Sequence, residues 1–341
     1  MRARPAKPKA RVRAASVLQV RDLIVEIPTR RGVLRPVDGV SLDIAAGEVL
    51  GVVGESGAGK SMMGSAVIGL FDPPTHIASG AIRLAGQRLD LMRPEQLREI
   101  RGRRIGMVFQ DPLTSLNPLI RVGDQLTETI RSNLGVPRRE AEERALAALL
   151  EVGIPGAEDR LRSYPHEFSG GMRQRVVIAL ALCAEPKLVI ADEPTTALDV
   201  SVQAQIIALL KRLCRERGTA VMLITHDMGV IAEAADRVAV MYAGRLAEIG
   251  PVADVVGRPA HPYTEGLMAS TPMATAPGKR LAQIPGAMPR LDAIPPGCAF
   301  HPRCPQAEAG CFLDPRPTID ACGGRAACWV RARERRMDRV S

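Results

Sequence analysis

The feature that most constrains the fold of this chain is a glycine-rich loop at residues 54–61. The loop reads Gly54-Glu55-Ser56-Gly57-Ala58-Gly59-Lys60-Ser61 and fits the pattern G-x-x-x-x-G-K-S. The short apolar run 48–53 precedes it and predicts a buried parallel strand, and the run 62–70 follows it and predicts a helix. A strand, a glycine loop and a helix in this order are the context that a phosphate-binding P-loop requires, and they disfavour a chance glycine-rich turn.

The residues of this loop have distinct expected roles around a nucleotide. The glycines let the backbone turn so that successive N–H groups, up to Met62 at the start of the helix, face an anion. Lys60 would reach the β- and γ-phosphates, and Ser61 would ligate Mg²⁺. The helix N-terminus adds a partial positive charge at the same place.

Composition limits the class of protein. The chain has 341 residues, of which 46% are apolar and 3% aromatic, so a sizeable core must be mainly aliphatic. The sequence shows no apolar run of about eighteen residues and no secretory signal, so we expect a cytosolic protein that reaches a membrane only through partners. Much of the net charge of +9 lies near the two termini. Two explanations fit these basic ends: they are solvated and mobile, or they are attracted to an anionic membrane.

The hydrophobic pattern divides the chain into successive parts. Residues 1–15 are expected to form a disordered basic arm and residues 331–341 a basic tail. Residues 16–255 predict an α/β nucleotide-binding domain, and the proline- and cysteine-rich residues 256–330 predict a C-terminal extension.

Within the nucleotide-binding domain, three patterns stand out. Alternating segments between residues 17 and 44 predict antiparallel strands with one solvated face. Residues 114–175 predict a helical subdomain, and residues 201–217 predict a helix that ends at Gly218. The apolar runs 187–192 and 220–225 predict further buried strands.

An acidic pair ends the first of these buried runs. Asp192 lies at the carboxyl end of the predicted strand, where it can hold Mg²⁺ directly or through water. Glu193 comes next and is the candidate to polarise an attacking water. The alternative is a simple acidic strand end before the turn at Pro194.

A second glycine loop, Phe168-Ser169-Gly170-Gly171-Met172-Arg173-Gln174-Arg175, precedes a helical run. Ser169 and its two glycines would expose backbone donors at a helix N-terminus. Together with the P-loop and the acidic pair, this loop resembles the signature loop of the ABC-type ATPases. The resemblance implies that the loop closes on ATP held by the P-loop of another subunit, so that ATP joins a dimer and hydrolysis releases it.

Other elements of that family follow in the expected order. Gln110 matches the glutamine that senses Mg²⁺ and contacts the transport partner, Ala197-Leu198-Asp199 matches the D-loop, and His226 matches the histidine that contacts the γ-phosphate. The resemblance thus implies catalytic roles for Glu193, His226 and Gln110; Mg²⁺ contacts for Ser61, Gln110 and Asp192; and ATP contacts for residues 54–62, Asp192, Ser169, Gly170 and Gly171.

A narrower resemblance covers about residues 17–330. The segments 110–118, 168–175 and 261–264 and the cysteine-bearing tail look like those of the ATP-binding subunits of oligopeptide/dipeptide/nickel importers. The implied fold is α/β, a P-loop NTPase core of the ABC type with an antiparallel β subdomain, a helical subdomain and a cysteine-containing C-terminal extension.

The same resemblance implies an activity and partners. It describes an ATPase at the cytoplasmic face of the plasma membrane that powers import of peptides or similar small solutes. The expected partners are a second related ATPase (as a heterodimer or homodimer), two transmembrane permeases and, indirectly, an extracytoplasmic solute-binding protein, but no nucleic acid. The alternative is a non-transport ABC ATPase in translation or DNA repair, which the single cassette and the lack of a heptad run disfavour.

The sequence departs from the family pattern at two places. Met172 stands where the general signature has glutamine. The aromatic residue that stacks on adenine is not evident, and Ile27 lies nearest its expected place. We therefore expect the phosphates, rather than the base, to carry most of the affinity for ATP.

Five of the 7 cysteines lie in the C-terminal part of the chain. Adjacent members of this group are too far apart in sequence for the usual zinc spacing, and disulfides are not expected in the cytosol. A 4Fe-4S cluster, free buried thiols and zinc all stay open at this point. By resemblance, the cluster ligands would be Cys298, Cys304, Cys311 and Cys328, with Cys322 as an extra cysteine.

Overall fold

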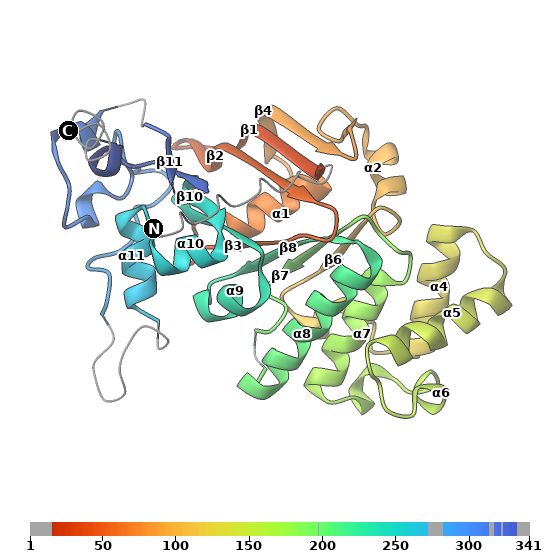
Figure 1. The fold of residues 1–341 in the computed structure, drawn as a ribbon. Coiled ribbons are helices and arrows are strands. Elements are labelled where there is room, and N and C mark those ends of the chain that lie inside the picture. Colours follow the sequence, from red (N-terminus) through yellow and green to blue (C-terminus); the bar gives the residue numbers. More distant parts are fainter. Residues whose placement is uncertain (1–15, 197, 272–281, 314–316, 322, 333–341) are drawn as a thin grey trace, which may run out of the picture.

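The computed structural model describes residues 16–196, 198–271, 282–313, 317–321 and 323–332. In these ranges the chain folds into α/β layers with two sheets (Figure 1). The predicted basic arm at 1–15, most of the tail at 331–341, Ala197 and Cys322 lie outside the described residues. The strands are β1 (Ser16–Thr29), β2 (Gly32–Ala45), β3 (Val49–Val53), β4 (His76–Leu84), β5 (Gln87–Arg88), β6 (Ile105–Val108), β7 (Leu188–Asp192), β8 (Ala220–Thr225), β9 (Arg237–Tyr242), β10 (Arg245–Pro251), β11 (Ile319–Ala321) and β12 (Gly324–Ala326).

Helices cover both faces of the larger sheet (Figure 1). The α-helices are α1 (Lys60–Ile68), α2 (Pro94–Ile100), α3 (Pro112–Ser115), α4 (Val122–Leu134), α5 (Arg138–Glu151), α6 (Ala157–Arg160), α7 (Gly170–Leu182), α8 (Val200–Arg217), α9 (Met228–Ala234), α10 (Val252–Gly257) and α11 (Pro262–Ala269). Short 3-10 helices are η1 (Pro165–Glu167), η3 (His301–Arg303) and η4 (Ala309–Phe312).

The larger sheet has a parallel centre. Its strand order is β11-β12-β10-β9-β3-β8-β7-β6. Strand β3 pairs in parallel with β8 and β9, and β7 pairs in parallel with β8 and β6. The carboxyl ends of β3, β6, β7 and β8 therefore meet at one edge, the edge at which open α/β sheets bind ligands.

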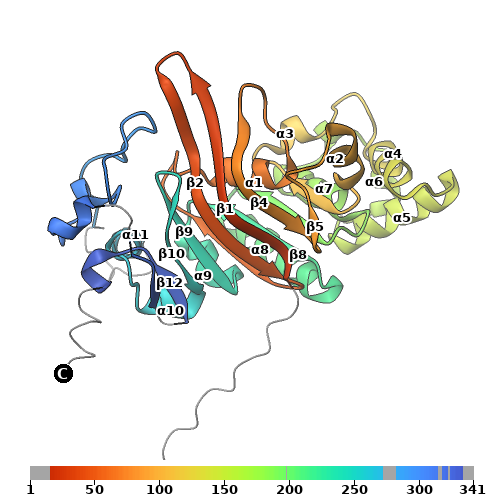
Figure 2. The same cartoon turned by 90° about the horizontal axis from the view of Figure 1, so that it is seen from above.

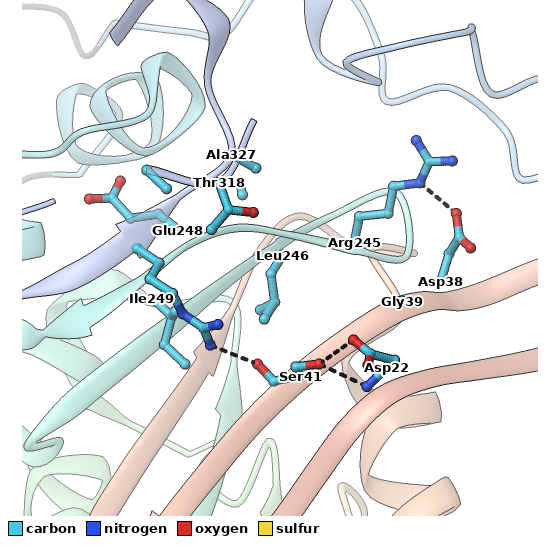
Figure 3. Close-up of a pocket in the computed structure, with 13 residues that line it drawn as sticks. Asp22, Asp38, Gly39, Ser41, Arg245, Leu246, Glu248, Ile249, Thr318 and Ala327 are labelled. Carbon is cyan, nitrogen blue, oxygen red and sulfur yellow. Dashed lines mark hydrogen bonds and ion pairs between the residues drawn. The ribbon is translucent and has the colours of Figure 1, made fainter. Parts of the chain in front are cut away.

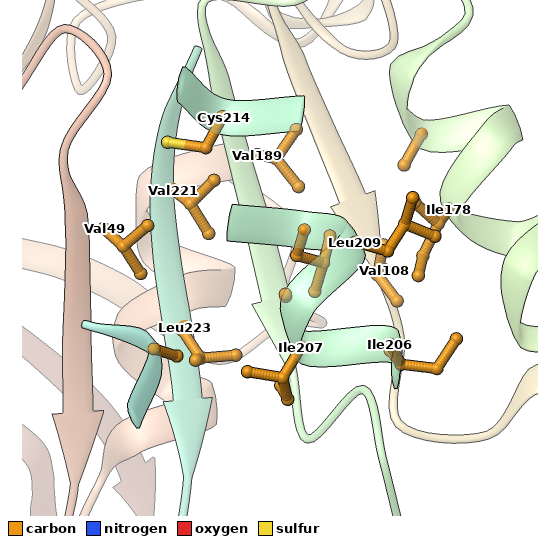
Figure 4. Packing of buried hydrophobic residues seen from close by; sticks show 14 of the residues in the cluster. Val49, Val108, Ile178, Val189, Ile206, Ile207, Leu209, Cys214, Val221 and Leu223 are labelled. Carbon is orange, nitrogen blue, oxygen red and sulfur yellow. The ribbon is translucent and has the colours of Figure 1, made fainter. Parts of the chain in front are cut away.

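The sheet separates two apolar cores. Alternate residues of β3 point to opposite sides: Val49 and Val53 join the core under α7, α8 and α9 (Figure 4), while Leu50 and Val52 join the core with α1 and the antiparallel sheet. All residues of β3, β7 and β8 are buried, which confirms the prediction of buried parallel strands.

The antiparallel sheet is the second layer of the molecule. Its order is β2-β1-β4-β5, and it confirms the antiparallel strands predicted near the start of the chain. The hairpin of β1 and β2 extends well beyond the rest of the sheet (Figure 2). Ile27, the residue nearest the expected adenine contact, pairs with Leu34 inside this hairpin and is partly exposed.

The predicted helix at 201–217 is confirmed as α8. Asp199 caps its start by accepting a hydrogen bond from the Val202 N–H, and Gly218 ends it with a φ of 64°. The region between β6 and β7 contains α3 to α7 and η1, which agrees with the helical pattern expected there.

The C-terminal part of the chain returns to the main sheet. Strand β12 pairs with β10, and β11 pairs with β12, both antiparallel. The described segment 282–313 packs near this edge, and Ala299 and Phe300 belong to the same core as α8 and β9. The extension is thus in direct contact with the nucleotide-binding part.

Candidate nucleotide site

The P-loop joins β3 to α1 and is tightly packed. Lys60 is 5% exposed, and its ammonium donates hydrogen bonds to the carbonyl oxygens of Gly54 (2.9 Å) and Glu55 (3.1 Å). Gly59 has a φ of 99°, and a Cβ atom there would lie 2.0 Å from the Pro36 carbonyl oxygen. Only glycine fits this position, because any side chain would displace the backbone of the neighbouring strand.

The acidic pair lies beside the P-loop, as the sheet edge predicts. The Ser61 hydroxyl donates to Asp192 Oδ1 at 3.1 Å, which places the two expected Mg²⁺ ligands together. Asp192 ends β7 and is 9% exposed. Carboxylate and hydroxyl oxygens are ligands that Mg²⁺ accepts, so this pair fits the ion.

Three polar side chains converge on Glu193. Gln110 Nε2 donates to Glu193 Oε2 at 3.1 Å, and His226 Nδ1 lies 3.2 Å from Glu193 Oε1. The Thr196 hydroxyl also donates to Oε2, at 3.0 Å. Gln110 and His226 follow β6 and β8, so the parallel sheet brings them to the carboxylate from both sides. Sequence reasoning missed Thr196, whose three-residue spacing from Glu193 was the available signal.

Burial and charge set the protonation of these groups. Burial lowers the pKa of the Lys60 ammonium, against the attraction of the Glu193 and Asp192 carboxylates. Burial raises the pKa of Asp192, although the Ser61 hydrogen bond acts against it. For Glu193, burial acts to raise the pKa, but the hydrogen bonds from His226 and Thr196 and the charges of His226 and Lys60 outweigh it and hold the pKa low. Glu193 is therefore ionised at neutral pH, as a general base must be.

The second glycine loop stands apart from this cluster. Ser169 caps α7 by accepting a hydrogen bond from the Met172 N–H at 3.3 Å. A Cβ atom on Gly170 would approach Leu198, and one on Gly171 would approach Val202, so the loop packs on the start of α8. Among the described residues, no hydrogen bond joins this loop to residues 54–61. The D-loop match includes Ala197, which lies outside the described residues.

The buried charge of Asp192 yields a stability prediction. Its raised pKa means that folding favours the neutral carboxyl, so at pH 7 the ionised group lowers the free energy of unfolding. We expect Asp192→Asn, which retains an acceptor for Ser61, to raise the melting temperature of the nucleotide-free protein by roughly 2–4 °C and to abolish stabilisation by MgATP. Thermal melts with and without MgATP measure both effects.

The matched control is Asp38→Asn, which breaks a half-buried ion pair with Arg245 (2.6 Å) and should lower the melting temperature. A lower melting temperature for Asp192→Asn as well would mean that Lys60 more than compensates the buried charge.

Cys298, Cys304, Cys311 and Cys328, the described cysteines of the extension, lie in one region of the structure. Cys298 donates its N–H to the Cys311 carbonyl oxygen at 2.8 Å, and Cys311 and Cys328 pack together. Burial raises the pKa of Cys304 and raises that of Cys328 to about 11, and nearby thiols add to both shifts. In the ranges that the structure describes, no three His, Cys, Asp or Glu side chains are arranged to hold one metal ion. The described geometry therefore does not support the predicted 4Fe-4S cluster.

A cavity of about 620 Å³ lies between β2 and the strands β10 and β12 (Figure 3). Its charged groups already have partners: Arg245 Nε donates to Asp38 Oδ2 at 2.6 Å, and Arg325 donates to the Ser41 carbonyl oxygen at 3.4 Å. None of the predicted nucleotide contacts lines it, so we assign the nucleotide to the sheet edge instead.

Sequence comparison places this geometry among known proteins. Residues 37–196 match the family described as ABC transporter, and residues 247–311 match the family described as Oligopeptide/dipeptide transporter, C-terminal region. The dipeptide transport ATP-binding protein DppD of Bacillus subtilis is 46% identical over 92% of this chain and 94% of its own length. The oligopeptide transport ATP-binding protein OppD of Salmonella typhimurium is 46% identical over 92% of this chain and 93% of its own.

Structure comparison points the same way. The ATP-binding cassette MJ0796, solved as a dimer in a post-hydrolysis state with ADP and Pi, superimposes with a TM-score of 0.62 at 27% identity. The match covers 69% of this chain and 98% of that one. The fold and the cluster around Glu193 thus define an ATPase of the ABC type.

Within that class, the chain belongs to the family of ABC-transporter ATP-binding proteins, in the group that carries the oligopeptide/dipeptide C-terminal region. No helix in the described part of the chain is long and apolar enough to cross a bilayer.

Proposed function

We propose that this chain hydrolyses ATP at a site shared between two cassettes and thereby powers import of peptides or similar small solutes through membrane permeases. The observation that carries the proposal is the convergence of Gln110 and His226 on Glu193, beside the Lys60 and Ser61 that would hold MgATP. Phosphoryl transfer to water requires a base, a contact to the γ-phosphate and a metal ligand at one site, and these residues supply all three.

The chemistry follows from the roles of these residues. Lys60 and the loop amides bind the phosphates. Ser61 and Asp192 would hold Mg²⁺, which would supply positive charge against the charge that develops during phosphoryl transfer. Glu193 orients and polarises the attacking water, and His226 and Gln110 position the Glu193 carboxylate. When MgATP is bound, His226 would contact the γ-phosphate and Gln110 would contact Mg²⁺. Ser169 and the glycines after it would complete the site of a partner cassette, because no hydrogen bond among the described residues joins them to residues 54–61 of their own chain.

The proposed assembly contains a second related ATPase, two transmembrane permeases and an extracytoplasmic solute-binding protein. The chain would associate peripherally with the permeases at the cytoplasmic face of the membrane. The division into residues 16–255 and the extension 256–330 belongs to this proposal. The alternative role in translation or DNA repair has no support from the relatives described above.

A groove beside the catalytic glutamine supports permease docking. It has a volume of about 540 Å³ between α1, β6 and α7, and its lining includes Leu70, Met107 and Phe109. Leu70 is 44% and Phe109 is 42% exposed, and a permease helix in the groove would cover both apolar side chains. Gln110 follows Phe109 directly, so an occupant would lie against the residue that contacts Glu193.

Phe109→Asp tests the groove. We expect the variant to lose association with permease-containing membranes and to bind MgATP with unchanged affinity, because the charge blocks an apolar contact without touching the P-loop. Membrane co-sedimentation and titration calorimetry measure the two properties. Leu150→Asp on α5, at a leucine that is 60% exposed, is the control and should retain association. Retained association of Phe109→Asp would exclude this groove.

The whole proposal is tested by reconstitution. Liposomes are prepared that contain the permeases, the partner ATPase and this chain, and the solute-binding protein is added outside. These liposomes should take up labelled dipeptides or oligopeptides only when MgATP is supplied. ATPase activity without uptake of any peptide would redirect the proposal to another solute class.

The iron–sulfur hypothesis for Cys298, Cys304, Cys311 and Cys328 requires the C-terminal segment to rearrange around the metal, since no such site exists in the described residues. Iron analysis and visible absorption of protein purified without oxygen decide it. Absence of iron together with thiols that react with a thiol reagent would show that these cysteines bind no cluster.

A further inference from the structure

The C-terminal extension reaches the P-loop through a buried ion pair. Arg303, at the end of η3, donates from Nη1 to Glu55 Oε2 at 2.7 Å and from Nη2 to Glu55 Oε1 at 2.9 Å. The Arg303 side chain is 6% exposed and the Glu55 side chain 28%. Glu55 is the second residue of the P-loop, so a bidentate contact ties the loop to a residue 248 positions away.

The guanidinium of Arg303 is itself held rigidly. Nε donates to the Pro285 carbonyl oxygen at 2.8 Å, Nη2 to the Ile284 carbonyl oxygen at 3.4 Å, and Nη1 to the Tyr242 hydroxyl at 3.3 Å. With the two bonds to Glu55, every N–H of the guanidinium has an acceptor. The guanidinium cannot rotate without breaking several of these hydrogen bonds. The position of the extension therefore fixes the position of the Glu55 carboxylate.

A tyrosine of the extension holds the backbone of the same residue. The Glu55 N–H donates to the Tyr263 hydroxyl at 2.9 Å, and Tyr263, on α11, is fully buried. Its ring lies 4.6 Å from that of Tyr242 and 5.3 Å from that of Phe300, and Tyr242 and Phe300 are also 5.3 Å apart. In a chain with only 3% aromatic residues, this cluster fixes the hydroxyl behind the P-loop.

Further contacts continue the connection towards the phosphate site. A Cβ atom on Gly57 would lie 3.2 Å from Met288 Cε, so the extension packs against the middle of the P-loop. The carbonyl oxygen of Glu55 accepts a hydrogen bond from the Lys60 ammonium. Glu55 thus joins the extension on one side to the phosphate-binding lysine on the other.

We propose that Arg303 and Tyr263 are positioning residues of the nucleotide site, through which the C-terminal extension holds the P-loop in its phosphate-binding conformation. The inference rests on the proposed role of the P-loop in binding ATP. Neither side chain contacts the reacting atoms; both act through Glu55. Because the loop amides bind phosphate equally in the ground state and the transition state, loosening the loop weakens ATP binding and raises KM more than it lowers kcat.

Two conservative variants of the full-length chain test the proposal. Arg303→Lys retains the charge but not the two-pronged contact, and we expect it to weaken MgATP binding about tenfold or more. Tyr263→Phe retains the ring in the aromatic cluster but removes the acceptor for the Glu55 N–H, and we expect a loss of roughly three- to tenfold. Titration calorimetry gives the dissociation constant for MgATP, and steady-state ATPase assays separate KM from kcat.

The matched control breaks a similar ion pair at the other end of β3. Arg237 Nη1 donates to Glu48 Oε1 at 2.9 Å, and the two side chains are 17% and 12% exposed. Glu48 precedes β3, whereas the P-loop follows it. Arg237→Lys should lower the melting temperature and leave the dissociation constant for MgATP unchanged, which separates a general loss of stability from loosening of the loop.

A double variant separates positioning from folding. Arg303→Met alone leaves the Glu55 carboxylate without its partner and should lower the melting temperature, whereas Arg303→Met with Glu55→Gln removes both charges and should restore much of it. If Arg303 positions the loop, KM for ATP stays raised in the double variant. Recovery of KM together with the melting temperature would show that the pair serves folding alone and would overturn the proposal.

The P-loop assignment itself is checked in parallel with Lys60→Ala. If this variant loses MgATP binding while Arg303→Lys and Tyr263→Phe bind as tightly as the unchanged chain, the positioning role is wrong and the nucleotide site stands. If Lys60→Ala still binds MgATP with full affinity, the nucleotide site is wrong and the positioning role falls with it.

Discussion

Glu193→Gln is expected to bind MgATP normally and to hydrolyse it about 10²- to 10⁴-fold more slowly than the unchanged chain. The amide has the shape of the carboxylate and can still contact Thr196 and Gln110, so the site should keep its geometry. It lacks the negative charge that polarises the attacking water. The low pKa of Glu193 ensures that this charge is present at neutral pH in the unchanged chain.

The same variant should accumulate an ATP-bound dimer with the partner cassette, because hydrolysis is the step that releases it. Steady-state turnover and light scattering in the presence of MgATP measure the two effects. Glu143→Gln, which changes a carboxylate that is 68% exposed on α5, is the control and should leave both unchanged. Unchanged turnover in Glu193→Gln would remove Glu193 from the role of base.

Lys60→Ala is expected to weaken MgATP binding about 10- to 100-fold, the range for loss of a charged hydrogen bond. The ammonium is 5% exposed, and the Asp192 and Glu193 carboxylates favour its charged form, so it meets the phosphates as a desolvated cation. Its bonds to the Gly54 and Glu55 carbonyl oxygens also close the loop. The variant therefore loses a phosphate contact and part of the loop structure together.

Titration calorimetry with MgATP measures this loss, and Lys187→Ala, at an exposed lysine before β7, is the control. With no aromatic residue between Ile24 and Arg35 to stack on the base, the phosphates should dominate the affinity. Affinity within twofold of the unchanged chain would instead place the phosphates at another site.

Much of the nucleotide site was predictable because its parts are local. Only glycine fits next to the Pro36 carbonyl oxygen, and a lysine and serine at the helix start face whatever the loop amides bind. The rule that parallel strands end at one ligand edge extends this to Asp192 and Glu193. His226 and Gln110 were assigned from the family resemblance. The α/β pattern and the buried strands around the P-loop followed from apolar periodicity, and the ABC-type fold class followed from the family resemblance.

The arrangement of the C-terminal cysteines could not be predicted from the sequence. Their number and the family resemblance predicted a 4Fe-4S cluster, yet spacing along an irregular segment does not determine how side chains meet in space. The structure brings Cys311 and Cys328 together and buries them, but presents no three ligands to one ion in the described residues.

Sequence alone determined the P-loop chemistry and the α/β fold, because both depend on short-range pattern: backbone conformation at glycines, and apolar periodicity in strands and helices. Only the tertiary structure decided that Arg303 forms an ion pair with Glu55 and that the Tyr263 hydroxyl accepts a hydrogen bond from the Glu55 N–H. These contacts join segments that are far apart in the sequence. Their geometry depends on how the extension, α11 included, packs against β9 and the P-loop. The glycine loop thus supplies the phosphate-binding groups, while residues far along the chain hold them in place.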